Sequence, residues 1–283
     1  MSKFNTLIKF TVEGSDKPFF AKLDPQTKVA AGSTVTAFQS FADLESGQRS
    51  EQVKIKKLLA PLPFENVPIY CVGLNYRSHA TEAKLSVPAY PPLWTKPAAS
   101  LADPADDIAL NQFCATSLPD YEGELVFVTS KECKNVSVKD APSFILGYTV
   151  GNDLSCRFFQ IQRNGAGQFF YAKAFDKFAP IGPALVSAGR YEATSKGRRL
   201  ITRVNGKVVQ NTEIATDQIF SPAQILSHMS QGTTIPAGTA VMTGTPAGVG
   251  AFRSPKTFLQ DGDSVEVEVT DVGVLQNTIR FEG

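Results

Sequence analysis

The sequence predicts a mainly β protein with some α-helix, and three observations support this. Residues 8–12 alternate between apolar and polar side chains, which is the pattern of a half-buried strand. Asn205-Gly206 separates two strand-like segments and is the strongest short hairpin signal available. Only the segment that begins at Ser221 carries a full set of helix signals. Strand signals therefore outnumber helix signals along the chain.

Residues 1–66 are expected to form a small β-rich N-terminal domain. After the first strand, residues 18–23 can return as a second strand, because a polar turn with a glycine lies between them. The apolar segment 52–59 then runs into a proline-rich stretch, residues 61–68, which indicates a domain boundary. Residues 67–283 are left for a larger domain.

The larger domain is expected to contain more strands than helices. Residues 271–273 mark a second hairpin with a three-residue loop. One helix is well marked, because Ser221 is a good N-cap, Pro222 fits the first helical position and Gly232 can end the helix. Residues 74–85 indicate a short helix or a loop. Strands are expected at residues 69–73, 122–129, 145–153, 200–204, 207–210, 240–242, 264–270 and 274–281.

Composition excludes several classes of protein. Hydrophobic residues make up 42% of the 283 residues and charged residues 19%, so the chain can build a substantial core and is not a disordered protein. The net charge of +1 gives no sign of a nucleic-acid partner. Apolar stretches are broken well short of the roughly 18 residues that a membrane span needs. We therefore expect neither a nucleic-acid nor a membrane partner.

The cysteines and the N-terminal segment predict a cytoplasmic protein. The four cysteines form no C-x-x-C motif and are expected to be free thiols in a reducing compartment. The N-terminal segment lacks the continuous apolar core of a signal peptide, and the first arginine is Arg49, which argues against a mitochondrial presequence. Only two histidines, His79 and His228, are present, so a metal site built from three histidines is excluded.

Two glutamates, Glu122 and Glu124, are the first candidates for chemistry. In a strand, side chains two residues apart share a face, so both carboxylates would lie beside Val126 and Val128. Adjacent carboxylates on a partly buried face repel each other, and a hard divalent cation relieves that repulsion. The alternative is an edge strand with two solvated glutamates, which the spacing alone favours because exposed glutamates are common.

Three further motifs could carry chemistry, although each also has an ordinary structural explanation. Asp153 ends an apolar strand and could supply a third oxygen ligand, or else form an Asx turn or a helix N-cap. His79 and Glu82 are neighbours on a helix and could act as a general-base pair, or else form a surface pair. Residues 243–250, rich in glycine and threonine, could bring N–H groups to an anion, or else form an ordinary turn.

Together these motifs resemble the fumarylacetoacetate hydrolase (FAH) superfamily, over roughly residues 67–283, which correspond to its catalytic domain. The resemblance lies in the order of the motifs, which is more specific than any one of them. In chain order they are Gly73-Leu74-Asn75-Tyr76, His79, Glu82, Lys96-Pro97, Glu122-Gly123-Glu124, Asn152-Asp153-Leu154-Ser155, Arg157, Gln160, Lys173-Ala174-Phe175-Asp176 and Thr243-Gly244-Thr245-Pro246.

The resemblance implies a mixed β-sandwich roll, a homodimer and a site with defined roles. The implied cofactor is Mg²⁺ or Mn²⁺, or Ca²⁺ in a crystal. The implied metal ligands are Glu122, Glu124 and Asp153. The implied catalytic residues are His79 and Glu82, on a mobile lid, and Lys173. The implied substrate-binding residues are Arg157, Gln160 and Thr245.

Two positions depart from the family pattern. Val72 stands where the authentic hydrolase has a fourth carboxylate ligand, and Phe158 stands where many relatives have an acidic residue directly after the arginine. The first departure indicates the three-carboxylate branch of the family. That branch includes acylpyruvate hydrolases, oxaloacetate decarboxylases and tautomerases, and hydroxymuconate-type isomerases.

The resemblance therefore implies a metal-dependent hydrolase or decarboxylase that acts on a small 2-oxo or 1,3-dicarbonyl acid, of the acylpyruvate or oxaloacetate type, through an enolate. The presence of both His79 and Glu82 favours these reactions, because the pair can activate water. An oxaloacetate tautomerase or a hydroxymuconate-type isomerase is the alternative enzyme. The non-enzyme alternative is a dicarboxylate-binding protein, against which the catalytic residues and the three carboxylates argue.

Overall fold

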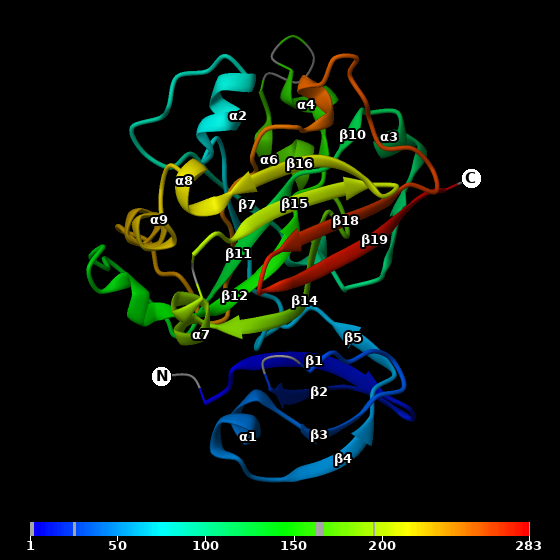
Figure 1. Cartoon of the computed structure of the whole chain (residues 1–283), viewed down its shortest axis with the longest axis vertical. Helices are drawn as coiled ribbons and strands as arrows, with labels where there is room; N and C mark the ends of the chain where they lie inside the picture. The colour runs from blue at the N-terminus through cyan, green and yellow to red at the C-terminus, as the bar shows by residue number, and fades with distance from the viewer. Residues whose placement is uncertain (1–2, 25–26, 162, 164–166, 195, 283) are drawn as a thin grey trace.

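The computed structural model describes residues 3–24, 27–161, 163, 167–194 and 196–282, and strands dominate the fold, as predicted. A small N-terminal unit lies at one end of the molecule and the rest of the chain forms a larger body (Figure 1). The elements of the small unit are β1 (Thr6–Val12), β2 (Ser15–Leu23), β3 (Thr34–Phe38), α1 (Phe41–Ser46), β4 (Ser50–Lys54) and β5 (Lys57–Leu59).

The N-terminal unit has its own small apolar core. Along β1 the side chains alternate between two faces, so Ile8 and Phe10 pack with Phe19 of β2 inside the unit. Leu7 lies on the opposite face and joins a core that is shared with the larger body. The unit is therefore packed both within itself and onto the rest of the chain.

The main sheet runs through both parts of the molecule. Its strands beyond the N-terminal unit are β6 (Ile69–Val72), β7 (Leu93–Lys96), β8 (Leu101–Ala102), β11 (Gly123–Thr129), β12 (Ile145–Asn152), β14 (Ala179–Ser187) and β17 (Ala240–Met242). In the described residues the strand order is β4-β3-β2-β1-β14-β12-β11-β17-β6-β7, with β5 paired to β1 and β8 to β14. The boundary between residues 66 and 67 stays a prediction, and it falls between β5 and β6 of this sheet.

A second sheet packs against the middle of the first and completes the sandwich. Its strands are β9 (Asp107–Leu110), β15 (Arg199–Val204), β16 (Lys207–Glu213), β18 (Ser264–Val269) and β19 (Gly273–Phe281), in the order β16-β15-β18-β19-β9. Strands β15, β18 and β19 contact β11, β12 and β14. Both predicted hairpins are confirmed, and the positive φ angles of 51° at Asn205 and 77° at Gly206 are those of a type I′ turn.

Short helices and a two-stranded ribbon surround the sheets. The predicted helix is confirmed as α9 (Pro222–Met229), where Ser221 and Gln224 form a capping box. The ribbon consists of β10 (Pro119–Asp120) and β13 (Ser155–Cys156). The other helices are α2 (Arg77–Glu82), α3 (Gln112–Ala115), α4 (Arg157–Gln160), α6 (Phe169–Lys173), α7 (Ala188–Ala193), α8 (Ile214–Asp217), η1 (Ala98–Ser100), η2 (Ala141–Phe144) and η3 (Gly250–Phe252). In the described part of the chain, none of the helices has the length and apolar character to pass through a bilayer.

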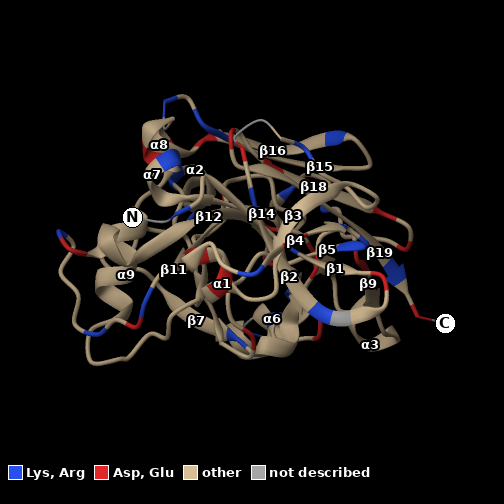
Figure 2. Cartoon of the chain, turned by 90° about the horizontal axis from the view of Figure 1, so that it is seen from below, with Lys and Arg blue, Asp and Glu red and all other residues tan. Residues whose placement is uncertain are grey.

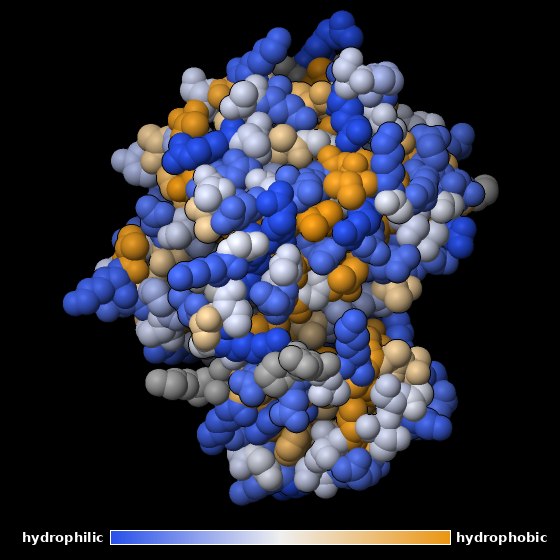
Figure 3. All heavy atoms as spheres, in the orientation of Figure 1, coloured by the Kyte–Doolittle hydropathy of each residue, from blue (hydrophilic) through white to orange (hydrophobic). Residues whose placement is uncertain are grey.

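The surface carries charges of both signs. Figure 2 shows lysine and arginine interspersed with aspartate and glutamate along the whole chain. On the face that Figure 3 displays, hydrophobic residues lie in small groups among hydrophilic ones. All four cysteines are free and buried, as predicted for free thiols. The unusual charges of this molecule are the buried ones.

Candidate active site

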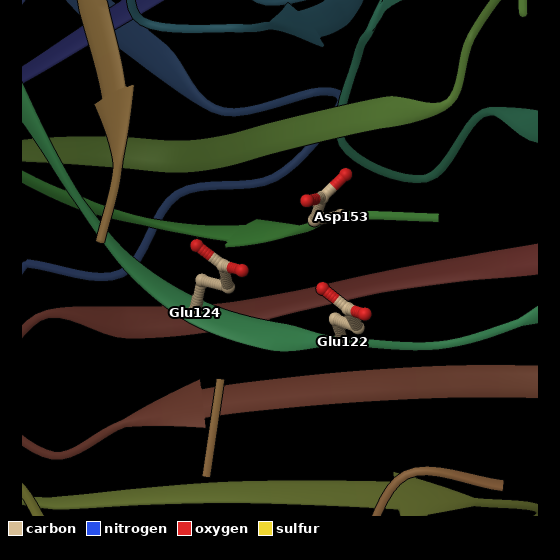
Figure 4. A group of neighbouring side chains, drawn as sticks. All are labelled: Glu122, Glu124 and Asp153. Carbon is tan, nitrogen blue, oxygen red and sulfur yellow. The ribbon is translucent and has the colours of Figure 1, made fainter. Parts of the chain in front are cut away.

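The pairing of β11 with β12 brings the three predicted carboxylates together. The strands are antiparallel and Gly123 lies opposite Asn152, so Asp153 comes beside Glu122 at the end of the pair. The Asp153 N–H donates to the Glu122 carbonyl oxygen at 2.8 Å. Glu124 lies on β11, and Glu122 directly precedes that strand (Figure 4). One oxygen of each of the three carboxylates lies within 4.8 Å of one oxygen of the other two.

The strand that carries the glutamates is central, and the edge-strand alternative is therefore wrong. β11 lies between β12 and β17 in the main sheet. Glu124 and Asp153 are fully buried, and Glu122 is 6% exposed. Val126 and Val128 pack in one core while Leu125 and Phe127 pack in another, which is the two-face alternation expected of a strand.

Glu124 has one buried oxygen without a partner. Its Oε2 accepts a hydrogen bond from the Gly244 N–H at 2.7 Å, whereas Oε1 has no hydrogen-bond partner among the described residues. Burial, together with the negative charges of Asp153 and Glu122, raises the pKa of Glu124 well above its usual range. An unsatisfied buried oxygen of this kind costs about 1–3 kcal/mol, and a proton or a cation at that oxygen removes the cost.

Two buried lysines neutralise part of the carboxylate charge. Lys173 Nζ lies 2.8 Å from Glu122 Oε2 and 2.9 Å from Asp153 Oδ2, and it also donates to Ser155 Oγ at 2.6 Å. Burial alone would lower the pKa of Lys173, but the charges of Asp153 and Glu122 raise it. The predicted catalytic lysine is therefore a charged ammonium group held directly against two of the three carboxylates.

The second lysine, Lys96, connects the site to the backbone around it. Its Nζ donates to the carbonyl oxygens of Leu154, Lys173 and Phe178 at 3.1, 2.7 and 2.7 Å. These bonds use its three protons, so the 2.6 Å approach to Asp153 Oδ1 is a charge contact rather than a directed hydrogen bond. Lys96 thereby positions the segments that carry Asp153 and Lys173.

Arg157 joins the carboxylates to a fourth acid. Its Nε donates to Asp120 Oδ2 at 2.8 Å and its Nη1 lies 2.5 Å from Glu122 Oε1. Burial raises the pKa of Glu122, but the charges of Lys173 and Arg157 outweigh burial and lower it to about 2. Arg157 Nη1 also donates to Gln160 Oε1 at 3.0 Å. In the described chain, Arg157 Nη2 and Gln160 Nε2 are buried donors without an acceptor.

The charges of the buried groups indicate that the cluster can bind an additional cation. When all four buried carboxylates of this cluster are ionised, they face three buried cations, so one negative charge remains among the described groups. The carboxylates are Asp120, Glu122, Glu124 and Asp153, and the cations are Lys96, Arg157 and Lys173. Oxygen ligands of this kind suit Mg²⁺, Mn²⁺ or Ca²⁺. The unpartnered Glu124 Oε1 and the remaining charge both fit a divalent cation held by the three predicted carboxylates.

The predicted His–Glu pair lies on α2. His79 Nδ1 is 3.4 Å from Glu82 Oε2, and the His79 ring packs edge-on against Phe252. Both Glu82 oxygens accept the Gly248 N–H, at 3.0 and 3.1 Å. Gly248 has φ of 108°, and a Cβ atom there would meet the Val209 carbonyl oxygen at 2.0 Å, so the position requires glycine. The structure thus brings the pair together and fixes Glu82 from the 243–250 loop.

The predicted substrate-binding threonine, Thr245, is bonded to the strand of the glutamates. Its Oγ1 donates to the Gly123 carbonyl oxygen at 2.9 Å and accepts from Gln210 Nε2 at 2.7 Å. Gln210 also donates to the Pro246 carbonyl oxygen at 2.9 Å and accepts the Gly123 N–H at 3.0 Å. Both backbone groups of the glycine between the two glutamates are therefore fixed by side chains. A direct role of Thr245 toward substrate stays a prediction.

Sequence reasoning missed several residues that build the site. Asp120 accepts the N–H groups of Gly250 and Ala251, at 2.8 and 2.9 Å, as well as Arg157. Asp120 and Gln210 stand in no chemical motif of their own, and a buried lysine such as Lys96 runs against the usual exposure of lysine. The signal available for Lys96 was its place in the ordered motif series, which gave it no role.

The comparisons with known proteins agree with this geometry. Residues 68–280 match the family model described as fumarylacetoacetate (FAA) hydrolase C-terminal. The human protein named oxaloacetate tautomerase FAHD2A, mitochondrial, is 34% identical over 249 residues, covering 83% of this chain and 78% of that protein. Oxaloacetate tautomerase YisK of Bacillus subtilis is 36% identical over 225 residues, covering 79% of this chain and 73% of that protein.

A solved structure extends the similarity to nearly the whole chain. The 5-carboxymethyl-2-hydroxymuconate delta-isomerase of Mycobacterium smegmatis superposes with a TM-score of 0.77 at 29% identity, covering 98% of this chain and 99% of that one. The similarity includes the N-terminal unit, to which the family model does not extend. With the family model matched over most of its length, this chain belongs to the fumarylacetoacetate hydrolase superfamily.

Proposed function

We propose that this protein is a metal-dependent enzyme that interconverts the keto and enol forms of a small 2-oxo acid of the oxaloacetate type. The observation that carries the proposal is the buried cluster of Glu122, Glu124 and Asp153, in which Glu124 Oε1 lacks a partner in the described chain. The names of the tautomerase and isomerase relatives favour this reaction over hydrolysis. A Mg²⁺ or Mn²⁺ ion held by the three carboxylates would supply Lewis-acid stabilisation of an enolate oxygen.

The residues of the chain account for binding. Arg157 Nη2 and Gln160 Nε2 are adjacent buried donors that lack an acceptor in the described residues, so they can bind a substrate carboxylate. Lys173 adds a fixed positive charge beside the carboxylates, where negative charge develops on the substrate oxygen.

His79 and Glu82 account for proton transfer. Glu82 beside Nδ1 favours the imidazole form with its proton on Nδ1, which leaves Nε2 to accept a proton from the carbon next to the keto group and to return it to the enolate oxygen, with the reverse transfer for the enol. The Gly248 N–H holds Glu82 in the orientation that this requires. The same Nε2 could instead accept a proton from water, so the pair also favours a second candidate, a hydrolase of acylpyruvates or an oxaloacetate decarboxylase.

One panel of substrates separates these reactions. Purified protein would be assayed with enol-oxaloacetate by loss of the enol absorbance, with oxaloacetate by pyruvate formation, and with acylpyruvates by cleavage. We expect enol conversion with Mg²⁺, its loss in EDTA and its return when excess Mg²⁺ is added. Activity that survives complete chelation would contradict the metal-dependent mechanism. Binding without turnover across the panel would favour the dicarboxylate-binding protein.

The two histidines provide a matched pair of variants for the same assay. His79→Gln should lower kcat by about 10²–10⁴-fold, the usual contribution of a general base. His228→Gln, on α9, changes the histidine that stacks on Tyr90 and should leave kcat unchanged. Equal activity in both variants would remove His79 from the mechanism.

We also propose, from the family resemblance, that the protein is a homodimer. Light scattering should then give a mass of twice 30.5 kDa. A mass of 30.5 kDa at all concentrations would contradict the dimer. The cytoplasmic location stays a prediction.

A further inference from the structure

The helix that carries His79 and Glu82 is attached to the rest of the protein through an aspartate outside it. Asp217 is the last residue of α8 and is half-buried. Its Oδ1 accepts the Ser78 N–H at 2.8 Å and its Oδ2 accepts the Ser78 hydroxyl at 2.5 Å. Because Ser78 directly precedes His79, these two bonds fix the backbone from which the imidazole projects.

Asp217 is itself held by the strand that precedes it. Thr212, on β16, donates its hydroxyl to Asp217 Oδ2 at 2.8 Å. The same strand carries Gln210, which holds the glycine between the two glutamates, and Val209, against which Gly248 packs. β16 therefore contacts β11, which carries Glu124, and also Asp217 and Gly248, which hold α2.

The far end of α2 is tied to the carboxylate strand through Gly248. The Gly248 N–H donates to Glu82, and its carbonyl oxygen accepts the Tyr121 hydroxyl at 2.8 Å. Tyr121 is the residue before Glu122, so Gly248 and the Tyr121 side chain connect Glu82 to the segment of the first metal-ligand candidate. The Ser78 hydroxyl also accepts the Ala247 N–H at 3.2 Å, which joins both attachments to the same loop.

We propose that Asp217 is a positioning residue that holds His79 and Glu82 in place on α2. The proposal rests on the proposed function, in which this pair handles the proton. Asp217 makes no hydrogen bond or ion pair with Glu122, Glu124 or Asp153 in the described chain. Its loss should therefore disturb proton transfer while leaving the binding of a metal ion intact.

The test uses Asp217→Ala, with Asp217→Asn measured in parallel because it keeps the side-chain volume if the alanine variant folds poorly. Asp140→Ala is the matched control, since exposed Asp140 accepts the Ser137 hydroxyl at 2.6 Å in a similar serine–aspartate pair. We expect Asp217→Ala to lower kcat for enol-oxaloacetate by about ten- to hundredfold, the effect of removing hydrogen bonds to a charged group. KM and the affinity for Mn²⁺ alone should change by less than about threefold.

Nuclear magnetic resonance of the imidazole rings gives a readout that does not depend on turnover. The chain has two histidines, so His228→Gln assigns the remaining ring resonance to His79. In Asp217→Ala we expect the His79 resonance to shift and broaden, and the amides of Ala80 on α2 and of its C-cap residue Ala83 to exchange about tenfold faster. Asp140→Ala should match the wild-type protein.

The outcomes separate this proposal from the proposed function. If the wild-type protein converts no 2-oxo acid, the proposed function fails, while the His79 resonance and the α2 amides still report whether Asp217 holds the helix. An unchanged resonance together with an unchanged kcat in Asp217→Ala would overturn the positioning role. A Mn²⁺ affinity that falls as far as kcat would overturn it as well, because the damage would then extend to the carboxylate cluster.

Discussion

The core of the N-terminal unit and the carboxylate cluster of the larger body are both buried, but they are stabilised in different ways. Ile8 and Phe10 gain about 1.5–3 kcal/mol each by leaving water, and they need no particular partner. Glu124 and Asp153 lose hydration when they are buried, and only charged or hydrogen-bonded partners offset that loss. The first region can thus be explained by stability alone.

The carboxylate cluster cannot be explained in that way. A well-packed apolar core of similar volume is often as stable as a buried ion cluster, or more so. The cluster moreover leaves Glu124 Oε1 without a partner in the described residues, which is a cost that stability does not require. Charge buried at such a cost is typical of functional sites. The comparison therefore predicts that changes to the core of the N-terminal unit alter stability alone. Changes to the carboxylate cluster should alter activity as well.

The largest effect should come from Lys173, which neutralises two carboxylates of the cluster. Lys173→Met removes the ammonium group from Glu122 and Asp153 and should lower the free energy of unfolding by about 3–5 kcal/mol, in addition to abolishing activity. Lys177→Met is the control, because Lys177 is half-exposed and its pair with Asp106 should contribute at most about 1 kcal/mol. Urea unfolding of both variants measures the difference. Similar losses of unfolding free energy in the two variants would contradict the special role assigned to the buried cluster.

The next effect should appear in stability but not in activity. Phe10→Ala removes a fully buried ring that stacks on Phe19 and should cost about 3–5 kcal/mol. Thermal unfolding measures this cost, and kcat is measured at a temperature where the variant stays folded. We expect kcat and the affinity for Mg²⁺ to match those of the wild-type protein. A change in kcat would show that the N-terminal unit takes part in the chemistry.

The smallest effect should come from an ion pair that joins the N-terminal unit to the larger body. Asp106 lies 2.6 Å from Lys57 of β5 and 3.1 Å from Lys177. Burial raises the pKa of Asp106, but these lysines outweigh burial and lower it. The ionised Asp106 therefore contributes its full stabilisation of the folded protein above about pH 3.8, the pKa of this carboxyl in the unfolded chain. That contribution is lost as the pH falls through the lower pKa of Asp106 in the folded protein.

The corresponding variant is Asp106→Asn. Its stability should be up to about 1 kcal/mol below that of the wild-type protein at neutral pH. The gap should narrow as the pH falls from about 5 to about 2. Urea unfolding across that range measures it. If the difference in stability between the two proteins widened at low pH, the folded protein would not lower the pKa of Asp106 as we infer.

Much of the fold could be predicted from local sequence. The hairpin at Asn205-Gly206 and the helix after Ser221 depend on short-range turn and capping chemistry, and both appear as predicted. β14 was not predicted, because Pro180 and Pro183 oppose a strand by propensity while its neighbours β1 and β12 supply the pairing. Such pairing joins segments far apart in the chain and cannot be read from a local pattern.

The candidate site divides in the same way. The shared face of Glu122 and Glu124 follows from strand geometry, and the ordered motifs pointed to Asp153 and Lys173. The partners that hold these residues come from other segments and were not predicted. Gln210 and Asp217 act through hydrogen bonds that exist only once β16 has packed beside the site.

The most direct test of the central claim is the stability of Glu124→Gln with and without Mg²⁺. Glutamine keeps the shape of the side chain and removes the charge that the cluster leaves unbalanced. In EDTA the variant should unfold at the same temperature as the wild-type protein or a higher one, because an unsatisfied buried carboxylate has gone. Added Mg²⁺ should raise the unfolding temperature of the wild-type protein but not that of the variant. Equal stabilisation of both by Mg²⁺ would contradict the claim that this carboxylate cluster holds the metal.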